Sequence, residues 1–407
     1  MITPAMPALT GGGLAMRMGL FLKCLASIAE VDVLVLPLGG MQRHHAELDS
    51  GFGSTCKIIP LVGREDTQLK LISRIADPVK QLIAFRSYGR SSLAAYLSAP
   101  VMADIIKATA GVSYDLVHVG RCYLAEAGLA VQRGARLTLD SDEDDAQVFR
   151  RRAALDFADQ KRNRGEFLLA EAEACESLQR ATLAKFDLVF ASSNEEAKSL
   201  SPYRNGRLVS VVFNTLQRPK QVMRNTGCNT LLFVGSLGYL PNRDGLKWFV
   251  REVWPLLQKG AKKPLQFLIV GRGCPPDIRN LNLIRGISVY EDVESLAEFY
   301  ARADVAVVPL FVGGGTRIKI IEAALHGVPV VSTSLGAAGL SFKNGQEIWL
   351  ADDAQAMAAC IVSALSSPER AVQLGEKARF KAIAEFDFDT ISKSLACQWT
   401  ELLAQPH

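Results

Sequence analysis

Short apolar runs alternate with longer segments of helical periodicity along most of the chain. Nine runs are mostly apolar rather than regularly alternating: Val31–Pro37, Leu116–Val119, Leu137–Asp140, Leu188–Ser192, Leu208–Phe213, Leu231–Val234, Phe267–Val270, Val305–Pro309 and Val328–Ser332. Such runs are typical of strands in a parallel sheet that helices cover on both faces. Helical spacing lies between them, for example at Leu14–Ile28, Phe167–Ala184, Gly245–Leu257 and Ile318–Leu325. The repeated strand and helix predict an α/β protein with doubly wound sheets.

A polar stretch near the middle of the chain predicts a linker. Residues 214–229 lack an apolar period and contain a proline and a glycine. A chain of 407 residues is long enough for two such domains. We expect a first Rossmann-like domain at 1–218, a second at 219–385 and a C-terminal helix at 386–407; one large sheet with insertions is the alternative. Only Met1–Thr3 precede the first loop, so the first strand is either short or begins upstream.

The charge balance narrows the classes of partner. Lys and Arg number 46 and Asp and Glu 42, so the net charge is +4. This value permits an anionic substrate or a membrane surface, and it is far below the basic footprint of a nucleic-acid-binding protein. The eight cysteines are scattered without a Cys-x-x-Cys pair, which is typical of reduced thiols in a cytoplasm. No apolar run suits a membrane span or a signal peptide, so we expect a cytoplasmic protein.

The first glycine loop opens a helix near the N-terminus. Gly12 and Gly13 precede the helical segment, and Arg17 lies one turn into it. Backbone N–H groups at a helix start suit a phosphate or a sugar oxygen, and Arg17 would add a charge. A tight structural turn is the alternative. The dinucleotide pattern G-x-G-x-x-G is absent, which disfavours a Rossmann oxidoreductase.

A second glycine loop follows the strand at Val305–Pro309. Gly314 and Gly315 end this loop, and Thr316 is a plausible N-cap of the next helix. Arg317 and Lys319 stand in the first helical turn, where cations oppose the helix dipole. Ligands of open α/β sheets bind beyond the carboxyl ends of the strands, so a bound diphosphate would explain both cations.

Glu322 stands in the middle of the same helix among apolar residues. A carboxylate in such surroundings is rarely without a partner. It could accept hydrogen bonds from two vicinal hydroxyls, as on a ribose, or form a salt bridge with Lys319 or Arg317. The sequence leaves both interpretations open.

Further glycine turns follow two other strands of the second half. Gly235 and Ser236 follow one strand, with Arg243 at the next helix, and Gly271–Gly273 follows another. Arg243 could reach a phosphate or could be a solvated residue of the helix start. Three glycine turns at strand ends, with arginines nearby, predict a nucleotide pocket.

Several of these segments together resemble a known family. The second half is similar to the nucleotide-binding domain of the GT-B glycosyltransferases of family 4 (group 1), through residues 233–257, 267–273, 303–340 and 386–391. The first half resembles the acceptor domain more loosely, through 3–17, 114–119, 190–196 and 211–214.

The resemblance implies a GT-B architecture of two Rossmann-like domains with an interdomain cleft, and a C-terminal helix at 386–407 that crosses back to the first domain. It implies transfer of a sugar from a nucleoside diphosphate sugar to an acceptor hydroxyl, with retention of configuration, no cofactor and no obligatory metal. It also implies a glycan or lipid-linked acceptor, a role in polysaccharide or glycoconjugate synthesis, and peripheral contact with the inner membrane face.

The resemblance assigns roles to individual residues of the donor site. Glu322 matches the second glutamate of the family signature E-x7-E, which grips the donor ribose. The first glutamate falls on Gly314, so backbone N–H groups of Gly314 and Gly315 would meet the donor instead. The phosphate-binding arginine of the family falls on Ser236.

The remaining cations would therefore share the phosphate. The family's partner lysine falls near Asn242 and Arg243, and we expect Arg243, Arg317 and Lys319 to contact the diphosphate together. His118 matches a family histidine near the transferred sugar; without the resemblance, a lone histidine on a strand is usually packed in the core.

Two further charged segments have candidate roles. The acidic run 140–145 follows a strand, and Asp142 and Asp144 could contact the acceptor, hold a metal as in GT-A enzymes, or form a solvated loop.

The segment Arg64–Arg90 has six cations against three acids and is roughly amphipathic, with Pro78 interrupting it. Such a segment can lie on an anionic membrane or pack on the first domain.

Two other function classes remain open. A non-catalytic nucleotide-sugar-binding or scaffold protein is suggested by Gly314 and Ser236, which depart from the family pattern. A GT-B epimerase or hydrolase would need additional acid/base groups, and the chain has only five histidines.

Overall fold

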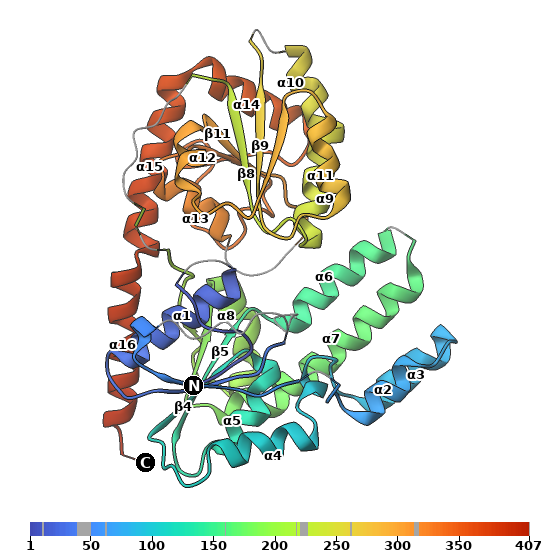
Figure 1. Cartoon of the computed structure of the whole chain (residues 1–407), viewed down its shortest axis with the longest axis vertical. Helices are drawn as coiled ribbons and strands as arrows, with labels where there is room; N and C mark the ends of the chain where they lie inside the picture. Colours follow the sequence, from blue (N-terminus) through green and yellow to red (C-terminus); the bar gives the residue numbers. More distant parts are fainter. Residues whose placement is uncertain are drawn as a thin grey trace. The chain divides into compact units, whose positions relative to one another are not determined.

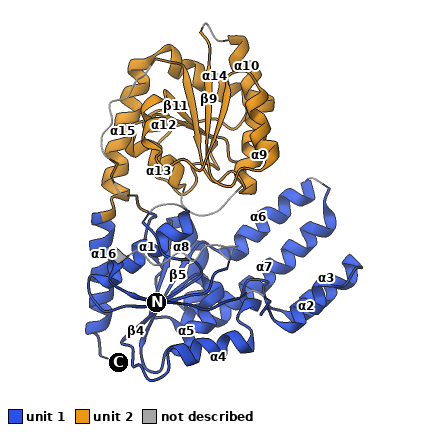
Figure 2. Ribbon diagram, viewed as in Figure 1, with its two compact units in different colours: residues 1–214, 389–407 blue, residues 215–388 orange. Residues whose placement is uncertain are grey.

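The computed structural model describes residues 1–9, 12–38, 50–61, 63–158, 160–216, 218–219, 227–260, 263–312 and 317–406. The chain forms two compact units (Figure 2). Unit 1 comprises residues 1–214 and 389–407, and unit 2 comprises residues 215–388. Each unit is an α/β domain built on its own parallel sheet, which confirms the predicted fold class (Figure 1).

Unit 1 contains a seven-stranded parallel sheet in the order β3-β2-β1-β4-β5-β6-β7. The strands are β1 (Ile2–Thr3), β2 (Asp32–Val35), β3 (Thr55–Ile58), β4 (Leu116–Gly120), β5 (Arg136–Asp142), β6 (Leu188–Ala191) and β7 (Ser210–Val211). Its helices are α1 (Gly13–Ala26), α2 (Thr67–Ser73), α3 (Pro78–Tyr88), α4 (Ala99–Ala108), α5 (Ala125–Val131), α6 (Asp145–Ala158), α7 (Arg162–Thr182), α8 (Asn194–Leu200) and α16 (Phe388–Ala404). The strand order reverses beside β1, which is the doubly wound arrangement.

Unit 2 contains a six-stranded parallel sheet in the order β10-β9-β8-β11-β12-β13. The strands are β8 (Thr230–Val234), β9 (Gln266–Gly271), β10 (Ile287–Glu291), β11 (Val305–Val308), β12 (Val330–Ser332) and β13 (Trp349–Leu350). Its helices are α9 (Leu240–Trp248), α10 (Trp254–Gly260), α11 (Pro276–Arg279), α12 (Ala297–Arg302), α13 (Ile318–Leu325), α14 (Ala354–Ser366) and α15 (Pro368–Phe386). Here the order reverses beside β8, so the loops after β8 and β11 lie at the switch point.

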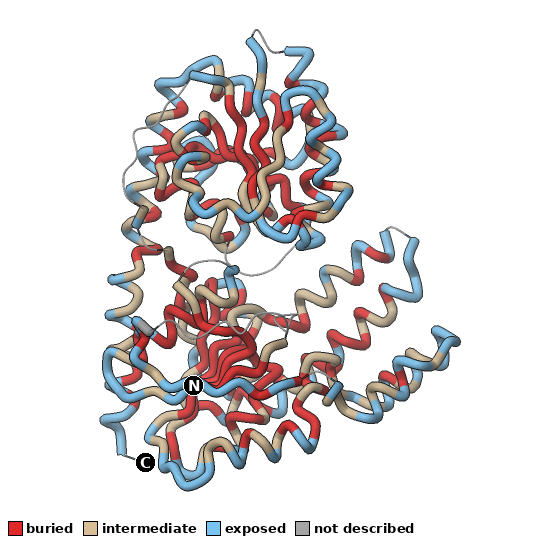
Figure 3. Tube along the Cα trace, viewed as in Figure 1, coloured by how far each residue is buried: buried red, intermediate tan, exposed pale blue. Residues whose placement is uncertain are grey.

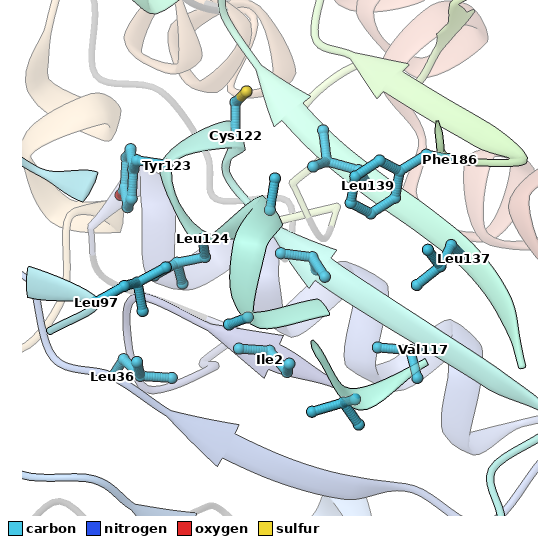
Figure 4. Packing of buried hydrophobic residues seen from close by; sticks show 14 of the residues in the cluster. Ile2, Leu36, Leu97, Val117, Cys122, Tyr123, Leu124, Leu137, Leu139 and Phe186 are labelled. Atoms are coloured by element: carbon cyan, nitrogen blue, oxygen red, sulfur yellow. The ribbon is translucent and has the colours of Figure 1, made fainter. Parts of the chain in front are cut away.

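The central strands are buried because helices cover both faces of each sheet (Figure 3). In unit 1, Val117 of β4 and Leu137 and Leu139 of β5 pack together with Phe186, all at most 3% exposed (Figure 4). The apolar runs that predicted these strands therefore form the core. Their burial holds the carboxyl ends of the strands in fixed positions.

Several elements differ from the predicted ones. The chain forms β3 and β10 at segments that are mixed in polarity, and the apolar pattern therefore missed them. The strand predicted at Leu208–Phe213 is reduced to Ser210–Val211, and Leu208 is 89% exposed. The helix predicted at Gly245–Leu257 begins earlier, at Leu240, and passes through a π-helical turn at Phe249–Val253.

The C-terminal helix α16 packs within unit 1. Trp399 is fully buried, with its ring 5.8 Å from Phe21, 5.5 Å from His118 and 6.0 Å from Phe190. Its indole N–H donates to the hydroxyl of Thr138 at 3.3 Å. This aromatic cluster joins α16 to α1 and to the central strands.

The basic segment Arg64–Arg90 forms the two helices α2 and α3. Asp66 caps α2 and Asp77 caps α3, and Pro78 is the first residue of α3, where a proline needs no amide hydrogen bond. The inner face packs on α7 through Phe85 and Phe167, whose rings are 4.6 Å apart. The prediction that this segment packs on the first domain therefore holds for one face of helices α2 and α3. Among the described residues, no helix combines the length and the apolar composition that crossing a bilayer requires.

Candidate functional site

Two glycine turns approach each other closely at the carboxyl edge of the unit 2 sheet. A Cβ on Gly271, at the end of β9, would lie 1.8 Å from the carbonyl oxygen of Gly235, just after β8. The amide of Leu237 donates to the carbonyl of Arg272 at 2.8 Å, which ties the two turns together. The glycines are therefore required by the packing of these loops, whatever they bind.

Lys319 of α13 points at the turn after β8. Its ammonium donates to the side-chain oxygen of Asn242 and lies 4.8 Å from the centre of the Phe233 ring. The amide of Asn242 in turn donates to the carbonyl of Ser236 at 2.7 Å. A Cβ on Gly235 would lie 3.2 Å from the ammonium, so the cation sits directly against this turn.

The charge of Lys319 is not balanced by an acid. No carboxylate of the described residues lies within 4 Å of its ammonium. Burial, together with repulsion from Arg317, lowers the pKa of Lys319 from 10.5 to about 7. Because its surroundings disfavour the charged form of Lys319, a bound anion would stabilise that form.

Arg317 lies immediately before α13 and is 7% exposed. One of its terminal nitrogens donates to the carbonyl of Leu335 at 3.2 Å. Two cations therefore stand at the start of a helix, where the helix dipole also favours negative charge. This combination is suited to a phosphate or diphosphate group.

Glu322 lies one turn further along α13. The hydroxyl of Tyr300 in α12 donates to its Oε2 at 3.0 Å. Burial raises the pKa of Glu322, and the hydrogen bond from Tyr300 opposes this rise. Among the described residues Glu322 forms no ion pair, so the salt bridge to Lys319 or Arg317 left open by the sequence is not formed.

Arg243, which was predicted to contact a phosphate, forms a salt bridge with an acid of its own unit. Its guanidinium donates to Asp277 of α11 at 2.8 Å, and the ammonium of Lys247 contacts the same carboxylate. The two cations hold the pKa of Asp277 well below its usual range. Contact between Arg243 and a phosphate stays a prediction, and it would require the arginine to share or leave this acid.

The predicted loop residues Gly314, Gly315 and Thr316 lie outside the described residues. Helix α13 begins at Ile318 as the sequence predicted, but its N-cap is Arg317, so the predicted N-cap at Thr316 is wrong. Of the predicted donor residues, the structure thus brings together Gly235, Ser236, Lys319, Arg317 and Glu322 at one edge of unit 2.

In unit 1, Arg17 is enclosed by its own unit. Its guanidinium forms a bidentate pair with Asp140 at 2.7 and 2.6 Å and also donates to the carbonyl of Val212 and the side chain of Asn214. Arg17 is 1% exposed, so its charge is used within the fold. Gly12 caps α1 and Gly13 begins it, and a Cβ on Gly12 would meet open space. A ligand role for these residues stays a prediction.

His118 lies inside the aromatic cluster of unit 1. It is fully buried and stacks on Phe21 at 4.7 Å, and its Nδ1 lies 2.9 Å from the hydroxyl of Thr138. Burial lowers its pKa well below the usual range, which keeps the ring neutral. The environment favours the packed interpretation, because a donor could touch His118 only if the cluster opened.

The acidic run after β5 is neutralised mainly by arginine. Arg121 donates to Asp142 at 2.9 Å and to Glu143 at 3.0 Å, and it also pairs with Asp145. Both Arg121 and Asp142 have positive φ angles, 75° and 62°. Backbone strain of this kind concentrates at functional sites.

Asp144 has a different environment from Asp142. It is fully buried, and its carboxylate accepts hydrogen bonds from the Gln147 amide, the Gln179 side chain and the Ser199 hydroxyl. The oxygens of Asp144 are therefore used in capping α6. Asp142, which is partly exposed, is the better candidate for contact with the acceptor substrate. Among the described residues, no three His, Cys, Asp or Glu side chains are grouped to hold a metal ion.

Sequence reasoning missed Tyr300, Asp277 and Arg121. Each forms a polar contact with a residue far away along the chain: Tyr300 with Glu322, Asp277 with Arg243 and Arg121 with Asp142. No spacing signal links such pairs, because they meet only when neighbouring strands and helices pack.

The described site lies within a segment that matches a known family. Residues 228–367 match the family described as Glycosyl transferases group 1. The matched residues all lie within unit 2. This segment contains Gly235, Tyr300, Arg317, Lys319 and Glu322.

One curated relative matches part of the chain. It is an uncharacterized 44.6 kDa protein in the cps region of Klebsiella pneumoniae, 28% identical over 136 residues, which are 31% of this chain. The match spans 34% of the length of that relative.

Solved structures share the whole fold. A sucrose-phosphate synthase from Thermosynechococcus elongatus gives a TM-score of 0.66 at 19% identity over 97% of this chain and 94% of its own. Anabaena Alr3699/HepE in complex with UDP-glucose gives 0.64 at 14% identity over 98% of both chains. A glycosyltransferase from Rickettsia africae gives 0.62 at 14% identity over 100% of this chain and 98% of its own. The chain therefore has the GT-B fold, and the family match supports a glycosyltransferase.

Proposed function

We propose that this protein is a retaining glycosyltransferase that moves a sugar from a nucleoside diphosphate sugar to an acceptor hydroxyl. One observation carries the proposal. Lys319 is half-buried beside Arg317, no carboxylate of the described residues pairs with its ammonium, and it stands at a helix start within a segment that matches glycosyl transferases group 1. A diphosphate would supply the missing negative charge.

The same arrangement would serve catalysis. Departure of the nucleoside diphosphate is the difficult step, because negative charge develops on its leaving oxygen. Lys319, Arg317 and the positive end of α13 would stabilise that charge in a preformed environment. Retention follows from the family resemblance, in which the departing phosphate takes the acceptor proton on the same face of the sugar.

The biological role is proposed from the relative and the resemblance. A curated relative lies in a cps region, which is consistent with polysaccharide synthesis. We therefore propose that the acceptor is a glycan or a lipid-linked glycan and that the protein acts in the cytoplasm. No cofactor besides the donor substrate is part of this proposal.

The helices α2 and α3 support peripheral contact with an anionic membrane. Leu71, Val79 and Ile83 are 59%, 62% and 61% exposed. Arg74 and Lys80 are exposed beside them, and neither forms an ion pair with a described residue. Residues 67–88 hold four cations and one acid, a net charge of +3. Exposed aliphatics among cations fit an anionic lipid surface.

A non-catalytic nucleotide-sugar-binding protein is the second candidate. Gly314 stands where the family has its first glutamate, and Ser236 stands where it has an arginine. Such a protein would bind the donor without turnover. An epimerase would instead release an altered nucleotide sugar without any acceptor.

A thermal-shift panel tests the donor site. UDP, GDP, ADP and dTDP, and their sugars, would be added to the full chain and to Glu322→Ala, with Glu376→Ala on the exposed face of α15 as the matched control. A ligand that binds only the folded protein raises Tm by mass action. We expect one nucleotide to raise Tm for the wild type and the control, and less for Glu322→Ala.

The same nucleotide sugar then enters a transfer assay. Transfer with the α-anomer retained supports the proposed enzyme, and binding without turnover supports the second candidate. No shift with any nucleotide at millimolar concentration would overturn the proposed donor site.

A further inference from the structure

Only one oxygen of the Glu322 carboxylate has a hydrogen-bond partner among the described residues. Its Oε2 accepts the hydroxyl of Tyr300 at 3.0 Å, whereas Oε1 accepts no hydrogen bond from a described residue. Glu322 is half-buried, and Oε1 is not among the fully buried side-chain atoms of the described residues, so this oxygen stays accessible. The free oxygen is thus available to a ligand hydroxyl.

The partner of Oε2 is held rigidly. Tyr300 is 1% exposed, and its ring stacks on His326 of the neighbouring helix with centroids 4.4 Å apart and planes 11° apart. Glu322 is the partner that the structure gives to its hydroxyl. The position of the hydroxyl is therefore set by packing before any ligand binds.

We propose that Tyr300 is a positioning residue, which fixes the carboxylate of Glu322 so that Oε1 faces the vicinal ribose hydroxyls of the donor. The inference rests on the proposed function, because it assigns the donor ribose to Glu322. Without Tyr300 the carboxylate could rotate, and binding would cost the freedom that the tyrosine now removes in advance.

Tyr300→Phe tests this role with little change of shape. We expect it to weaken binding of UDP about tenfold, the size expected for one hydrogen bond to a charged group. Tyr114→Phe is the matched control, because Tyr114 donates to Asp32 at the same 3.0 Å but lies in unit 1. In a Glu322→Gln background, Tyr300→Phe should have little further effect, since the two residues act as one unit.

Two readouts separate positioning from general damage. The wild type should prefer UDP to 2′-deoxy-UDP, and Tyr300→Phe should lose most of that preference. Loss of the Tyr300 hydrogen bond also raises the pKa of Glu322, so the weakening of UDP binding on acidification should begin at a higher pH in the variant.

The outcomes divide clearly. If the wild type binds UDP and Tyr300→Phe binds it equally well with the same pH profile, the positioning role is overturned and the donor site stands. If the effects of the two substitutions simply add, the positioning role is also overturned. If the wild type binds none of UDP, GDP, ADP and dTDP, both this inference and the proposed function fall.

Discussion

Replacing Lys319 by methionine should change stability and ligand binding in opposite directions. Lys319 is half-buried, its ammonium lies against Phe233 and Asn242, and no acid of the described residues lies within 4 Å of it. Methionine keeps much of the length of the apolar stem and removes the charge. The protein without ligand should therefore become more stable, whereas a diphosphate should bind less tightly.

The pKa of Lys319 sets the size of the stability change. Its value falls from 10.5 to about 7 on folding, so the unfolded chain binds more protons between these two pH values. Stability contributed by this group therefore rises with pH through that window and is lowest below pH 7. At pH 7 the charge of Lys319 therefore lowers the free energy of unfolding by at most about 4 kcal/mol. Lys319→Met should recover part of it and flatten the pH dependence.

Binding should respond in the opposite sense. Loss of a charge-assisted hydrogen bond to a diphosphate should weaken binding about 10- to 100-fold. In the wild type, binding of UDP should also weaken as the pH rises above about 7, because the free lysine then loses its proton.

Calorimetry on the full chain measures both effects. We expect Lys319→Met to raise Tm by roughly 4 °C or more at pH 7. Lys377→Met on the exposed face of α15 is the matched control and should change neither Tm nor binding. A variant that is no more stable than the wild type and binds UDP as tightly would refute the argument that Lys319 is an uncompensated cation in an anion site.

Three further predictions concern the fold and the surface. Trp399→Ala should destabilise unit 1 by about 3–5 kcal/mol, measured by denaturant unfolding, because it leaves a cavity among three aromatic rings. Gly271→Ala should cost about 1–3 kcal/mol, because its Cβ would lie 1.8 Å from a carbonyl oxygen. Ile83→Asp should reduce sedimentation with phosphatidylglycerol-containing vesicles at least about fivefold.

Each of the three has a control in the same chain. Leu403→Ala, on the outer side of α16, should cost far less than Trp399→Ala. Gly260→Ala should be tolerated, because its Cβ would meet nothing within 4 Å. Leu283→Asp, at an exposed leucine of unit 2, should leave vesicle binding unchanged. Equal binding to neutral phosphatidylcholine vesicles would contradict the proposed role of the cations.

Much of the fold was predictable from local patterns. The runs at Leu231–Val234, Phe267–Val270 and Val305–Pro309 predicted β8, β9 and β11 because strands buried on both faces must be apolar throughout. Strands β3 and β10 escaped the same rule because they are not buried throughout. All four positions of β3 are exposed.

The candidate site was predictable only in part. Arg317, Lys319 and Glu322 stand in one short segment, so their spacing along a single helix placed them together. The choice between partners was not predictable, because Glu322 meets Tyr300 only when the consecutive helices α12 and α13 pack together. The same holds for Arg17 of α1, whose partner Asp140 lies in strand β5.

The sequence by itself determined the class of the fold and the polarity of its strand ends. These properties follow from residues close together in the chain: apolar runs, glycine turns and the cations that follow them. The tertiary structure alone decided which charges are balanced. It paired Arg17 with Asp140 and Arg243 with Asp277, whereas Lys319 pairs with no acid in the described part of the chain. Electrostatic balance depends on distances of a few ångström between separate elements, and only packing sets those distances.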